Sequence, residues 1–396
     1  MSTFVIVGGG LAGAKAAEAL REQGHDGDLV LIGDEQLPPY ERPPLSKGYL
    51  AGDSPWDDAV VHPESWYAEH DVDLRLGTRV TALRPADHVV EVGGAELGYD
   101  KLLLATGSSP RHLPGDDGLL HFRRRADSEA VRDRFGSGRM VIVGGGWIGL
   151  EVAATARSAG TEVAVLEAAE LPLLAALGPE LAQDFAALHR DHDVDLRLGV
   201  KVDELRPDGV RLADGTTIDA ATVLVAVGAR PDTDLAEAAG LAVDDGVLVD
   251  ASLRTSDADI YAAGDIANAQ HPFLGTRVRV EHWANALNQP AVAAAGMLGQ
   301  DKQYDELPYF YTDQYDLGME YVGLARDYSE VVIRGDRAGR EFIAFWLDGS
   351  RRVLAGMNVN VWDVGDPIKA LIRSRQPVDV ARLADPDRPL DEVTGE

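Results

Sequence analysis

The sequence predicts an α/β protein with two Rossmann-like domains followed by a C-terminal α+β domain. Two observations predict this fold class. A glycine fingerprint occurs twice, at residues 8–13 and 144–149, and each copy follows an apolar run and precedes an alanine-rich stretch. A pattern of alternating apolar strands begins only beyond Pro308. The first pattern is typical of the strand-turn-helix units of doubly wound sheets, and the second indicates a separate α+β unit.

Each fingerprint has the spacing of a dinucleotide-binding turn, in which glycines let a pyrophosphate reach the amides at the positive end of a helix. An acidic residue for a ribose hydroxyl is expected about 20 residues later. Asp34 lies 34 − 13 = 21 residues beyond Gly13, and Glu167 lies 167 − 149 = 18 residues beyond Gly149. Two such copies predict that one chain binds two nucleotides. The fingerprint residues expected to contact them are Gly8, Gly10, Leu11, Ala12, Gly13, Gly144, Gly146, Trp147, Ile148 and Gly149.

The second halves of the two modules repeat as well. The stretch at residues 70–77 recurs at 192–199, and each copy is followed by an apolar strand that ends in a glycine turn, at Gly107 and Gly228. The fingerprints are offset by 144 − 8 = 136 residues and this repeat by 192 − 70 = 122, so the first copy holds 136 − 122 = 14 additional residues. They fall around the proline-rich segment 38–47, which indicates a task that the second copy lacks.

The later elements follow from apolar patterning and glycine stops. A helix is expected from about Glu281 to Leu298, ended by Gly299. Strands are expected at 321–324, 330–334, 342–347 and 352–357, and a helix near 367–375.

Composition narrows the class of protein. Acidic residues exceed basic ones by 66 − 37 = 29, so the mean field of the protein repels nucleic acid. No apolar run reaches the roughly 18 residues of a membrane span, and the N-terminal segment lacks the features of a signal peptide. We therefore expect a cytoplasmic protein without nucleic-acid or membrane partners.

The chain contains no cysteine, which excludes disulfides, thiolate nucleophiles and cysteine-ligated iron–sulfur clusters. Its redox chemistry, if any, must therefore use a bound organic cofactor. The histidines are scattered without the spacing of a ligand set, so no metal is expected.

Taken together, these motifs resemble the NADH-dependent ferredoxin reductases of oxygenase systems, the family of putidaredoxin reductase and the biphenyl dioxygenase reductase component, which have the glutathione-reductase fold. The resemblance covers essentially the whole chain. The segments that carry it are 41–47, 105–107, 144–151, 263–265, 281–287 and 313–316. Two departures stand out: tyrosines occupy positions 309 and 311 where relatives often have tryptophans, and residues 167–178 lack the arginine of many relatives.

This resemblance implies an FAD-binding domain at residues 1–108 and 232–307, an NADH-binding domain at 109–231 and a C-terminal interface domain at 308–396. It also implies that hydride passes from NADH to FAD, and single electrons then pass to a small acidic iron–sulfur ferredoxin that serves a cytochrome P450 or a Rieske-type oxygenase. Because disulfide reductases of this fold need a protein cysteine, the electrons here must go to an external acceptor.

The resemblance also implies the residues of the redox site. Lys47 is expected beside the reactive edge of the flavin, where its ammonium would stabilise the negative charge gained with the hydride, and Glu151 is its expected counter-ion. The further expected FAD contacts are Arg42, Val80, Ala105, Thr106, Gly107, Arg125, Gly264, Asp265 and Trp283. Glu167 favours NADH over NADPH, because a carboxylate accepts from a ribose hydroxyl but repels a phosphate. Gly228 completes the NADH set.

Several alternatives stay open at this point. A rubredoxin is an alternative carrier, and an NADH oxidase or quinone reductase is an alternative enzyme. A different class is an NADH-sensing protein that resembles apoptosis-inducing factor, in which flavin reduction changes the association state. Two arginine pairs are candidates for carrier docking: Arg277 with Arg279, and Arg351 with Arg352.

Overall fold

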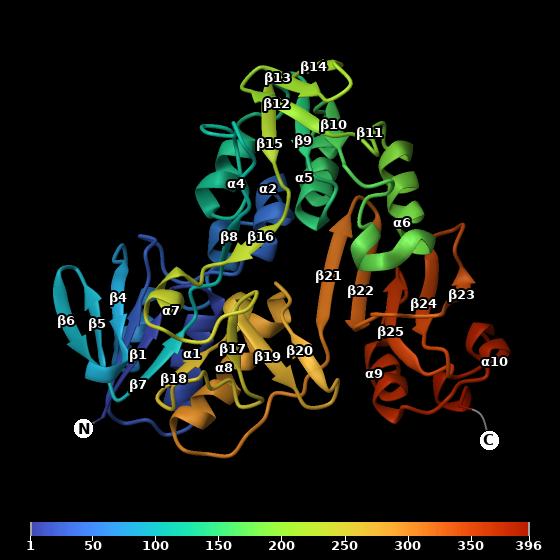
Figure 1. The fold of residues 1–396 in the computed structure, drawn as a ribbon. Coiled ribbons are helices and arrows are strands. Elements are labelled where there is room, and N and C mark those ends of the chain that lie inside the picture. Colours follow the sequence, from blue (N-terminus) through green and yellow to red (C-terminus); the bar gives the residue numbers. More distant parts are fainter. Residues whose placement is uncertain (1, 395–396) are drawn as a thin grey trace. The chain divides into compact units, whose positions relative to one another are not determined.

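The computed structural model describes residues 2–394, and its chain forms two compact units (Figure 1). The first unit comprises residues 1–44, 54–109 and 229–306, and the second comprises 45–53, 110–228 and 307–396. The expected separation of 109–231 from 308–396 into two domains stays a prediction. Among the described residues, no helix is both long enough and apolar enough to cross a lipid bilayer.

A five-stranded parallel sheet forms the centre of the first unit (Figure 1). Its inner strands are mostly apolar and buried, as in parallel sheets with both faces covered, whereas the edge strand at residues 72–75 carries the polar Asp73 and Arg75. On one face lie α1 (Leu11–Glu22) and α8 (Trp283–Met297), which pack against each other. In spatial order the strands are β18 (Ile260–Ala262), β7 (Lys101–Leu104), β1 (Thr3–Val7), β2 (Asp28–Ile32) and β3 (Val72–Arg75).

Smaller elements complete the first unit. One three-stranded sheet consists of β4 (Val80–Arg84), β5 (Val89–Val92) and β6 (Ala95–Gly98), and another of β17 (Val247–Val249), β19 (Ala267–His271) and β20 (Thr276–Val278). The short helices are α3 (Glu64–Glu69), α7 (Asp234–Ala238), η2 (Trp56–Ala59), η3 (Pro85–Asp87) and η4 (Gly264–Ile266). Two strands at the unit boundaries, β8 (Ser108–Pro110) and β16 (Ala229–Pro231), pair with each other.

The second unit contains the second parallel sheet, in the order β11 (Asp195–Arg197), β10 (Val163–Leu166), β9 (Met140–Val143) and β15 (Thr222–Val225). A three-stranded antiparallel sheet accompanies it, formed by β12 (Val202–Arg206), β13 (Gly209–Leu212) and β14 (Thr217–Asp219). The helices of this part are α4 (Arg125–Arg132), α5 (Trp147–Ser158) and α6 (Leu174–Asp191), together with α2 (Gly48–Ala51) from the early chain. The short helix η1 (Pro43–Ser46) begins in the first unit and ends in the second.

An antiparallel five-stranded sheet forms the C-terminal part of the second unit (Figure 1). Its order is β21 (Tyr309–Gln314), β22 (Leu317–Gly323), β25 (Val353–Val359), β24 (Glu341–Leu347) and β23 (Glu330–Asp336). Against it pack α9 (Gly365–Ser374) and α10 (Val380–Ala384), and η5 (Leu390–Glu392) follows. The expected α/β class with a C-terminal α+β part is confirmed.

One strand of this sheet, β21, was not expected from the pattern. Its inward positions carry Thr312 and Gln314, which are almost fully buried although they are polar. Apolar alternation therefore does not mark it. The strand nevertheless belongs to the sheet and packs against α5.

Candidate functional site

The first glycine fingerprint forms an open turn between β1 and α1. Gly8 has a positive φ of 128°, and a Cβ atom there would lie 2.1 Å from the carbonyl oxygen of Ala105. A Cβ on Gly13 would lie 2.0 Å from the carbonyl oxygen of Gly8. A Cβ on Gly10 would instead meet nothing within 4 Å, and no side chain caps the helix that begins there. The turn thus leaves room for a phosphate at the helix N-terminus.

The second fingerprint repeats this geometry between β9 and α5. A Cβ on Gly144, whose φ is 111°, would lie 2.3 Å from the carbonyl oxygen of Ala226. A Cβ on Gly149 would lie 2.2 Å from the carbonyl oxygen of Gly144. Gly146 faces open space and caps α5 without a side-chain hydrogen bond. Both turns therefore fit a dinucleotide pyrophosphate. A side chain at the first or last glycine of either turn would clash with a backbone carbonyl oxygen, so glycine is needed there for steric reasons.

The two expected ribose acids lie in different surroundings. Asp34 is exposed and forms an ion pair of 2.9 Å with Arg79. Glu167 accepts hydrogen bonds from the amides of Gly145 and Ala169, each at 2.7 Å. The carboxylate of Glu167 is thus fixed at the second glycine turn. It keeps lone pairs for a further donor.

Two further expected FAD contacts of the first unit lie where β7 and β18 end. Thr106 donates its hydroxyl to the carbonyl oxygen of Asp232 at 2.9 Å. Asp265 accepts from the hydroxyl of Ser108 at 2.7 Å. Because these strands are parallel neighbours, their carboxyl ends bring the two segments to one edge of the sheet. None of the sequence motifs described above includes Ser108.

Other expected FAD contacts of the first unit lie at the ends of strands or the starts of helices and strands. Ala105 and Gly107 flank Thr106, Gly264 begins η4, Val80 begins β4, and the fingerprint residues Leu11 and Ala12 are buried in the first turn of α1.

Glu41 and Arg42 lie in the segment after β2, and Glu41 forms a hydrogen bond with Trp283 at the start of α8. The guanidinium of Arg42 lies 3.5 Å from Glu35 and 5.4 Å from the ring centroid of Tyr40. The indole of Trp283 donates to the carboxylate of Glu41 at 3.1 Å. Burial raises the pKa of Glu41, while the Trp283 hydrogen bond acts in the opposite direction. Arg42 therefore contacts Glu35 and Tyr40, and Trp283 contacts Glu41, the residue that precedes Arg42.

Arg125, also expected at FAD, belongs to the second unit. It begins α4, where it donates to Glu129 at 2.8 Å and to the hydroxyl of Tyr49 at 3.1 Å. Its role at a flavin stays a prediction.

Lys47 and Glu151 form an ion pair in the second unit, with 2.6 Å between Nζ and Oε1; Glu151 is buried, and the Lys47 side chain is 14% exposed. Glu151 also accepts from the hydroxyl of Ser46 at 2.5 Å and from that of Thr312 at 2.6 Å. The ammonium of Lys47 lies 5.4 Å from the ring centroid of Tyr311. The structure therefore brings together the two residues expected to be catalytic. Ser46 and Thr312 were not expected there, although both lie within or beside motifs that the sequence contains.

Two further fingerprint residues of α5 differ in exposure. The ring of Trp147 packs against Phe185 and Phe310, at centroid distances of 5.5 Å and 4.6 Å. Ile148, by contrast, is a large apolar side chain that is 41% exposed. An exposed apolar residue in the first turn of this helix fits contact with a planar ligand. Gly228, after β15, has a φ of 101°.

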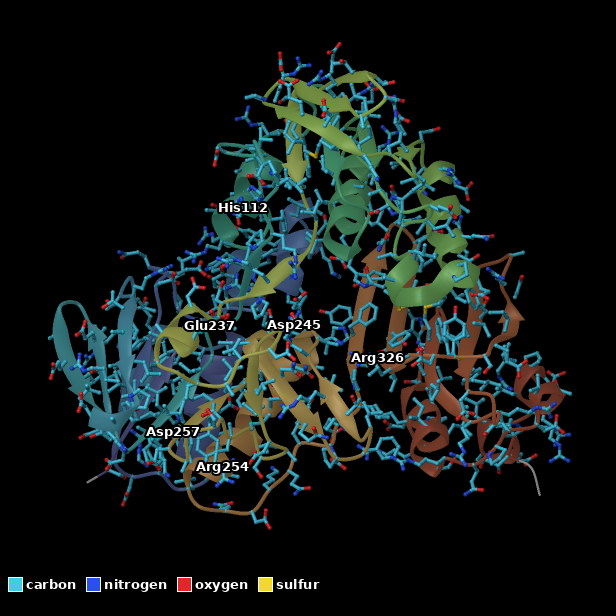
Figure 2. All side chains as sticks on the ribbon, viewed as in Figure 1. His112, Glu237, Asp245, Arg254, Asp257 and Arg326 are labelled. Atoms are coloured by element: carbon cyan, nitrogen blue, oxygen red, sulfur yellow. The ribbon has the colours of Figure 1, made fainter. Side chains whose placement is uncertain are left out.

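Three side chains gather in a way that the scattered spacing of the histidines did not indicate. His112, labelled in Figure 2, has its Nδ1 3.1 Å from the carboxylate of the buried Asp116, and His121 has its Nε2 3.4 Å from the same carboxylate. Burial acts to raise the pKa of Asp116, but hydrogen bonds from the Leu113 amide and His112 outweigh it and lower the pKa. One ligand atom from each of these three residues lies within 4.8 Å of the other two, a spacing that could hold a metal ion. The expectation of no metal therefore stays a prediction.

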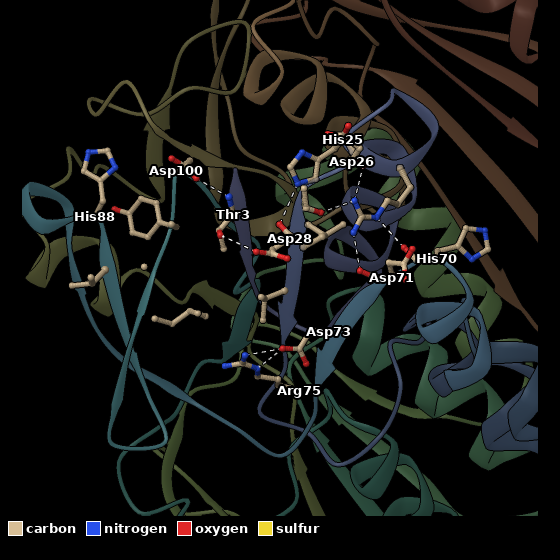
Figure 3. A pocket seen from close by; sticks show the side chains of 18 of the residues that line it. Thr3, His25, Asp26, Asp28, His70, Asp71, Asp73, Arg75, His88 and Asp100 are labelled. Carbon is tan, nitrogen blue, oxygen red and sulfur yellow. Dashed lines mark hydrogen bonds and ion pairs between the residues drawn. The ribbon is translucent and has the colours of Figure 1, made fainter. Parts of the chain in front are cut away.

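A hollow of about 1130 Å³ lies at the amino ends of β1 and β2 (Figure 3). Its polar groups are bonded to one another: Thr3 donates its amide to Asp100 at 2.6 Å, and Arg21 donates to the carbonyl oxygens of His25 and Asp71. Ligands of doubly wound sheets bind at the carboxyl ends of the strands, where the glycine turns lie. This hollow is therefore not the nucleotide site.

Comparisons with known proteins agree with this geometry. Residues 2–290 match the family described as pyridine nucleotide-disulphide oxidoreductase, and residues 309–394 match the reductase C-terminal family. The chain is 42% identical to the 5,5'-dehydrodivanillate O-demethylase ferredoxin reductase subunit of Sphingobium sp., covering 98% of each chain. It is also 42% identical to the anthranilate 1,2-dioxygenase system ferredoxin–NAD(+) reductase component of Burkholderia cepacia, covering 97% of each.

A solved structure shows the same likeness in three dimensions. The structure is the crystal structure of the covalent putidaredoxin reductase–putidaredoxin complex, with a TM-score of 0.95 and 37% sequence identity. The match covers 99% of this chain and 97% of that chain.

Proposed function

Because the chain belongs to the pyridine nucleotide-disulphide oxidoreductase family, among the ferredoxin–NAD(+) reductases, we propose that it is an FAD-dependent NADH:ferredoxin oxidoreductase. The observation that carries this proposal is the pair of glycine turns, each with space for a pyrophosphate, on a chain without cysteine. When bound, FAD accepts a hydride from NADH and releases the two electrons singly.

The residues of the chain bind and orient these groups. The first glycine turn is assigned to FAD and the second to NADH, with Glu167 accepting from the ribose of NADH. Lys47 is assigned the charge that stabilises the flavin as it gains electron density, and Glu151 holds the ammonium of Lys47 in place. Glu151 is buried, which weakens the screening of its charge by water and strengthens the electrostatic effect of the pair.

The electron acceptor is proposed to be a small acidic iron–sulfur ferredoxin of a P450 or Rieske-type oxygenase system. The relatives named above include reductase components of oxygenase systems and a complex with putidaredoxin. A chain without cysteine has no protein thiol to reduce, so electrons leave the protein on a separate carrier. We place the protein in the cytoplasm, where NADH is available.

An absorbance spectrum tests both cofactor assignments. The purified protein should show flavin bands that bleach within seconds when NADH is added and hardly change with NADPH. Protein that stays colourless after incubation with FAD contradicts the proposal.

A turnover assay tests the acceptor. With excess NADH, a [2Fe–2S] ferredoxin should be reduced much faster than a rubredoxin, a quinone or dissolved oxygen. Dominant oxygen or quinone reduction would instead identify an oxidase or a quinone reductase. Slow reoxidation by every carrier, together with a change of mass on reduction, would identify an NADH-sensing protein.

A further inference from the structure

A series of buried hydrogen bonds extends from Glu151 within the second unit. Thr312 donates to Glu151 at 2.6 Å, Nε2 of Gln314 donates to the Thr312 hydroxyl at 3.2 Å, and Oε1 of Gln314 lies 2.8 Å from Nε2 of His189. These side chains come from α5, β21 and α6. All four residues are at most 4% exposed. Water therefore does not replace their partners, and the direction of each bond can be derived from chemistry.

The donor and acceptor in each hydrogen bond can be assigned because the series ends at an ion-paired carboxylate. Glu151 paired with Lys47 can only accept, so Thr312 must donate its single hydroxyl proton to it. The Thr312 oxygen then accepts from the amide nitrogen of Gln314, which leaves the amide oxygen to accept from His189. A flipped Gln314 would present its oxygen to a hydroxyl whose proton is already used. His189 is consequently the tautomer that carries its proton on Nε2.

Burial supports a neutral His189. Desolvation lowers its pKa to about 4, with the Gln314 bond opposing and nearby His192 adding to the decrease. Nδ1 of His189 faces the hydroxyl of Tyr315 at 3.4 Å, and burial raises the pKa of Tyr315, so this hydroxyl stays protonated. The Tyr315 ring stacks on His192 with 3.6 Å between centroids, and Arg157 acts on Tyr315 electrostatically.

We propose that Gln314 and His189 are positioning residues that act through Thr312 on Glu151, and so hold the Lys47 ammonium in one orientation. His189 fixes the Gln314 amide, and Gln314 fills the lone pair of Thr312 that faces it, which commits the Thr312 proton to Glu151. Ser46 donates to the second carboxylate oxygen, so the carboxylate is held from both sides. The consequence for flavin reduction rests on the proposed function, whereas the tautomer and the hydrogen-bond directions do not.

Histidine nitrogen shifts test the derived directions without any cofactor chemistry. In protein labelled with ¹⁵N-histidine, the resonances assigned to His189 by their loss in His189→Gln should show a protonated Nε2 and an unprotonated Nδ1 at pH 7. A proton on Nδ1 would overturn the proposal. This result can be read even if the protein proves to have another electron acceptor.

Substitutions at Gln314 and Thr312 test the positioning role. Gln314→Glu keeps size and shape but presents an oxygen to Thr312, so two carboxylates compete for one hydroxyl proton. Thr312→Val removes the donor, and Thr312→Ser retains it. We expect hydride transfer from NADH, followed by stopped flow, to slow about tenfold in Gln314→Glu and Thr312→Val with a changed pH profile. Thr312→Ser should restore the wild-type rate.

The flavin midpoint potential provides a readout other than turnover. It should become more negative in Gln314→Glu and Thr312→Val, because a less ordered ammonium stabilises added charge less well. The matched control is Tyr321→Phe, a change in the neighbouring strand β22. It removes a buried hydroxyl that accepts a hydrogen bond of 3.1 Å from the Ala325 amide. Its rate and potential should equal those of wild type. Wild-type values in Thr312→Val would overturn the proposal even if Gln314→Glu fails to fold.

Discussion

At the scale of single residues, the chemistry of this protein centres on Glu151, a buried carboxylate with three donors. Lys47, Ser46 and Thr312 all reach it within 2.6 Å. A buried carboxylate that loses its cation pays a large desolvation penalty, whereas a neutral replacement of both partners does not. The pair is therefore sensitive to single changes.

We predict that Lys47→Met lowers the free energy of unfolding by about 3–5 kcal/mol, because it leaves Glu151 buried without a cation. Flavin reduction by NADH should slow at least about tenfold, or about 1.4 kcal/mol in the barrier. The double variant Lys47→Met with Glu151→Gln should regain much of the stability but not the rate. Urea unfolding and stopped flow on the four proteins of this cycle measure both effects. Equal recovery of rate and stability would argue against a role for the charge.

A second prediction at this scale concerns the choice of coenzyme. Glu167→Gln removes the charge that repels a 2'-phosphate, while its amide oxygen still accepts from the Gly145 or Ala169 amide. The ratio of kcat/KM for NADH to that for NADPH should fall at least about tenfold, since one ion-ion repulsion is removed. Glu170→Gln, which changes an exposed acid nearby, is the control. An unchanged ratio in Glu167→Gln would place the selectivity elsewhere.

At the scale of elements, each glycine turn joins a buried strand to a helix with an uncapped N-terminus. The first and last glycines are fixed by carbonyl oxygens of the backbone, which cannot move aside as a flexible side chain can. The middle glycine is needed for a different reason, because only the space it leaves is available to a ligand. Fold and binding thus depend on different glycines of one motif.

We predict that Gly13→Ala and Gly149→Ala separate the two nucleotide sites. A Cβ at 2.0 Å or 2.2 Å from a carbonyl oxygen must displace the turn. Gly13→Ala should be purified without flavin, whereas Gly149→Ala should keep its flavin and lose reduction by NADH. Gly10→Ala should melt close to wild type yet bind FAD weakly. The flavin absorbance per protein and thermal melting check these outcomes, and full flavin content in Gly13→Ala would contradict the assignment.

At the scale of the whole molecule, each unit contains a histidine whose pKa is lowered by desolvation: His189, which is buried, and His282, which is partly exposed. Burial lowers the pKa of His189 in the second unit and of His282 in the first unit to about 4. Between the ordinary value near 6.5 and about 4, the unfolded chain binds protons that the folded chain does not. The stability contribution is therefore complete above pH 6.5 and is lost as the pH falls toward 4.

We predict that the free energy of unfolding falls on acidification through this window, by at most about 1.4 kcal/mol per pH unit for each histidine. Acids with raised pKa values, such as Glu41 and Asp313, oppose this trend, so the comparison must be made between variants. His189→Gln should reduce the slope relative to wild type, and His88→Asn, which changes an exposed histidine, should not. Urea unfolding at pH 7, 6 and 5 gives the slopes. Equal slopes in wild type and His189→Gln would contradict the prediction.

The net charge of −29 raises the question of how an acidic carrier docks. Arg279 forms ion pairs with Asp245 and Glu281, at 3.0 Å and 2.7 Å, so its charge is already compensated. Arg351 and Arg352 are exposed. Reversal of both to Glu should raise the ferredoxin KM severalfold at low salt and much less at high salt, while NADH-to-flavin reduction stays unchanged. An unaltered KM would eliminate this pair as a docking site.

The sequence by itself determined the local features: two glycine turns, the apolar strands and helices around them, and the absence of a thiol acceptor. These features depend on neighbours in the chain, so spacing and residue type reveal them. It did not indicate β21, because Thr312 and Gln314 occupy the inward positions that apolar residues usually mark.

Only the tertiary structure decided how Glu151 is held. Its hydroxyl partners Ser46 and Thr312 lie 105 and 161 residues away along the chain, and His189 reaches the group only through Gln314. A hydrogen bond between distant segments leaves no periodic pattern, since each partner alone is an ordinary polar residue. Folding removes water from these groups, and that removal forces each donor onto a definite acceptor.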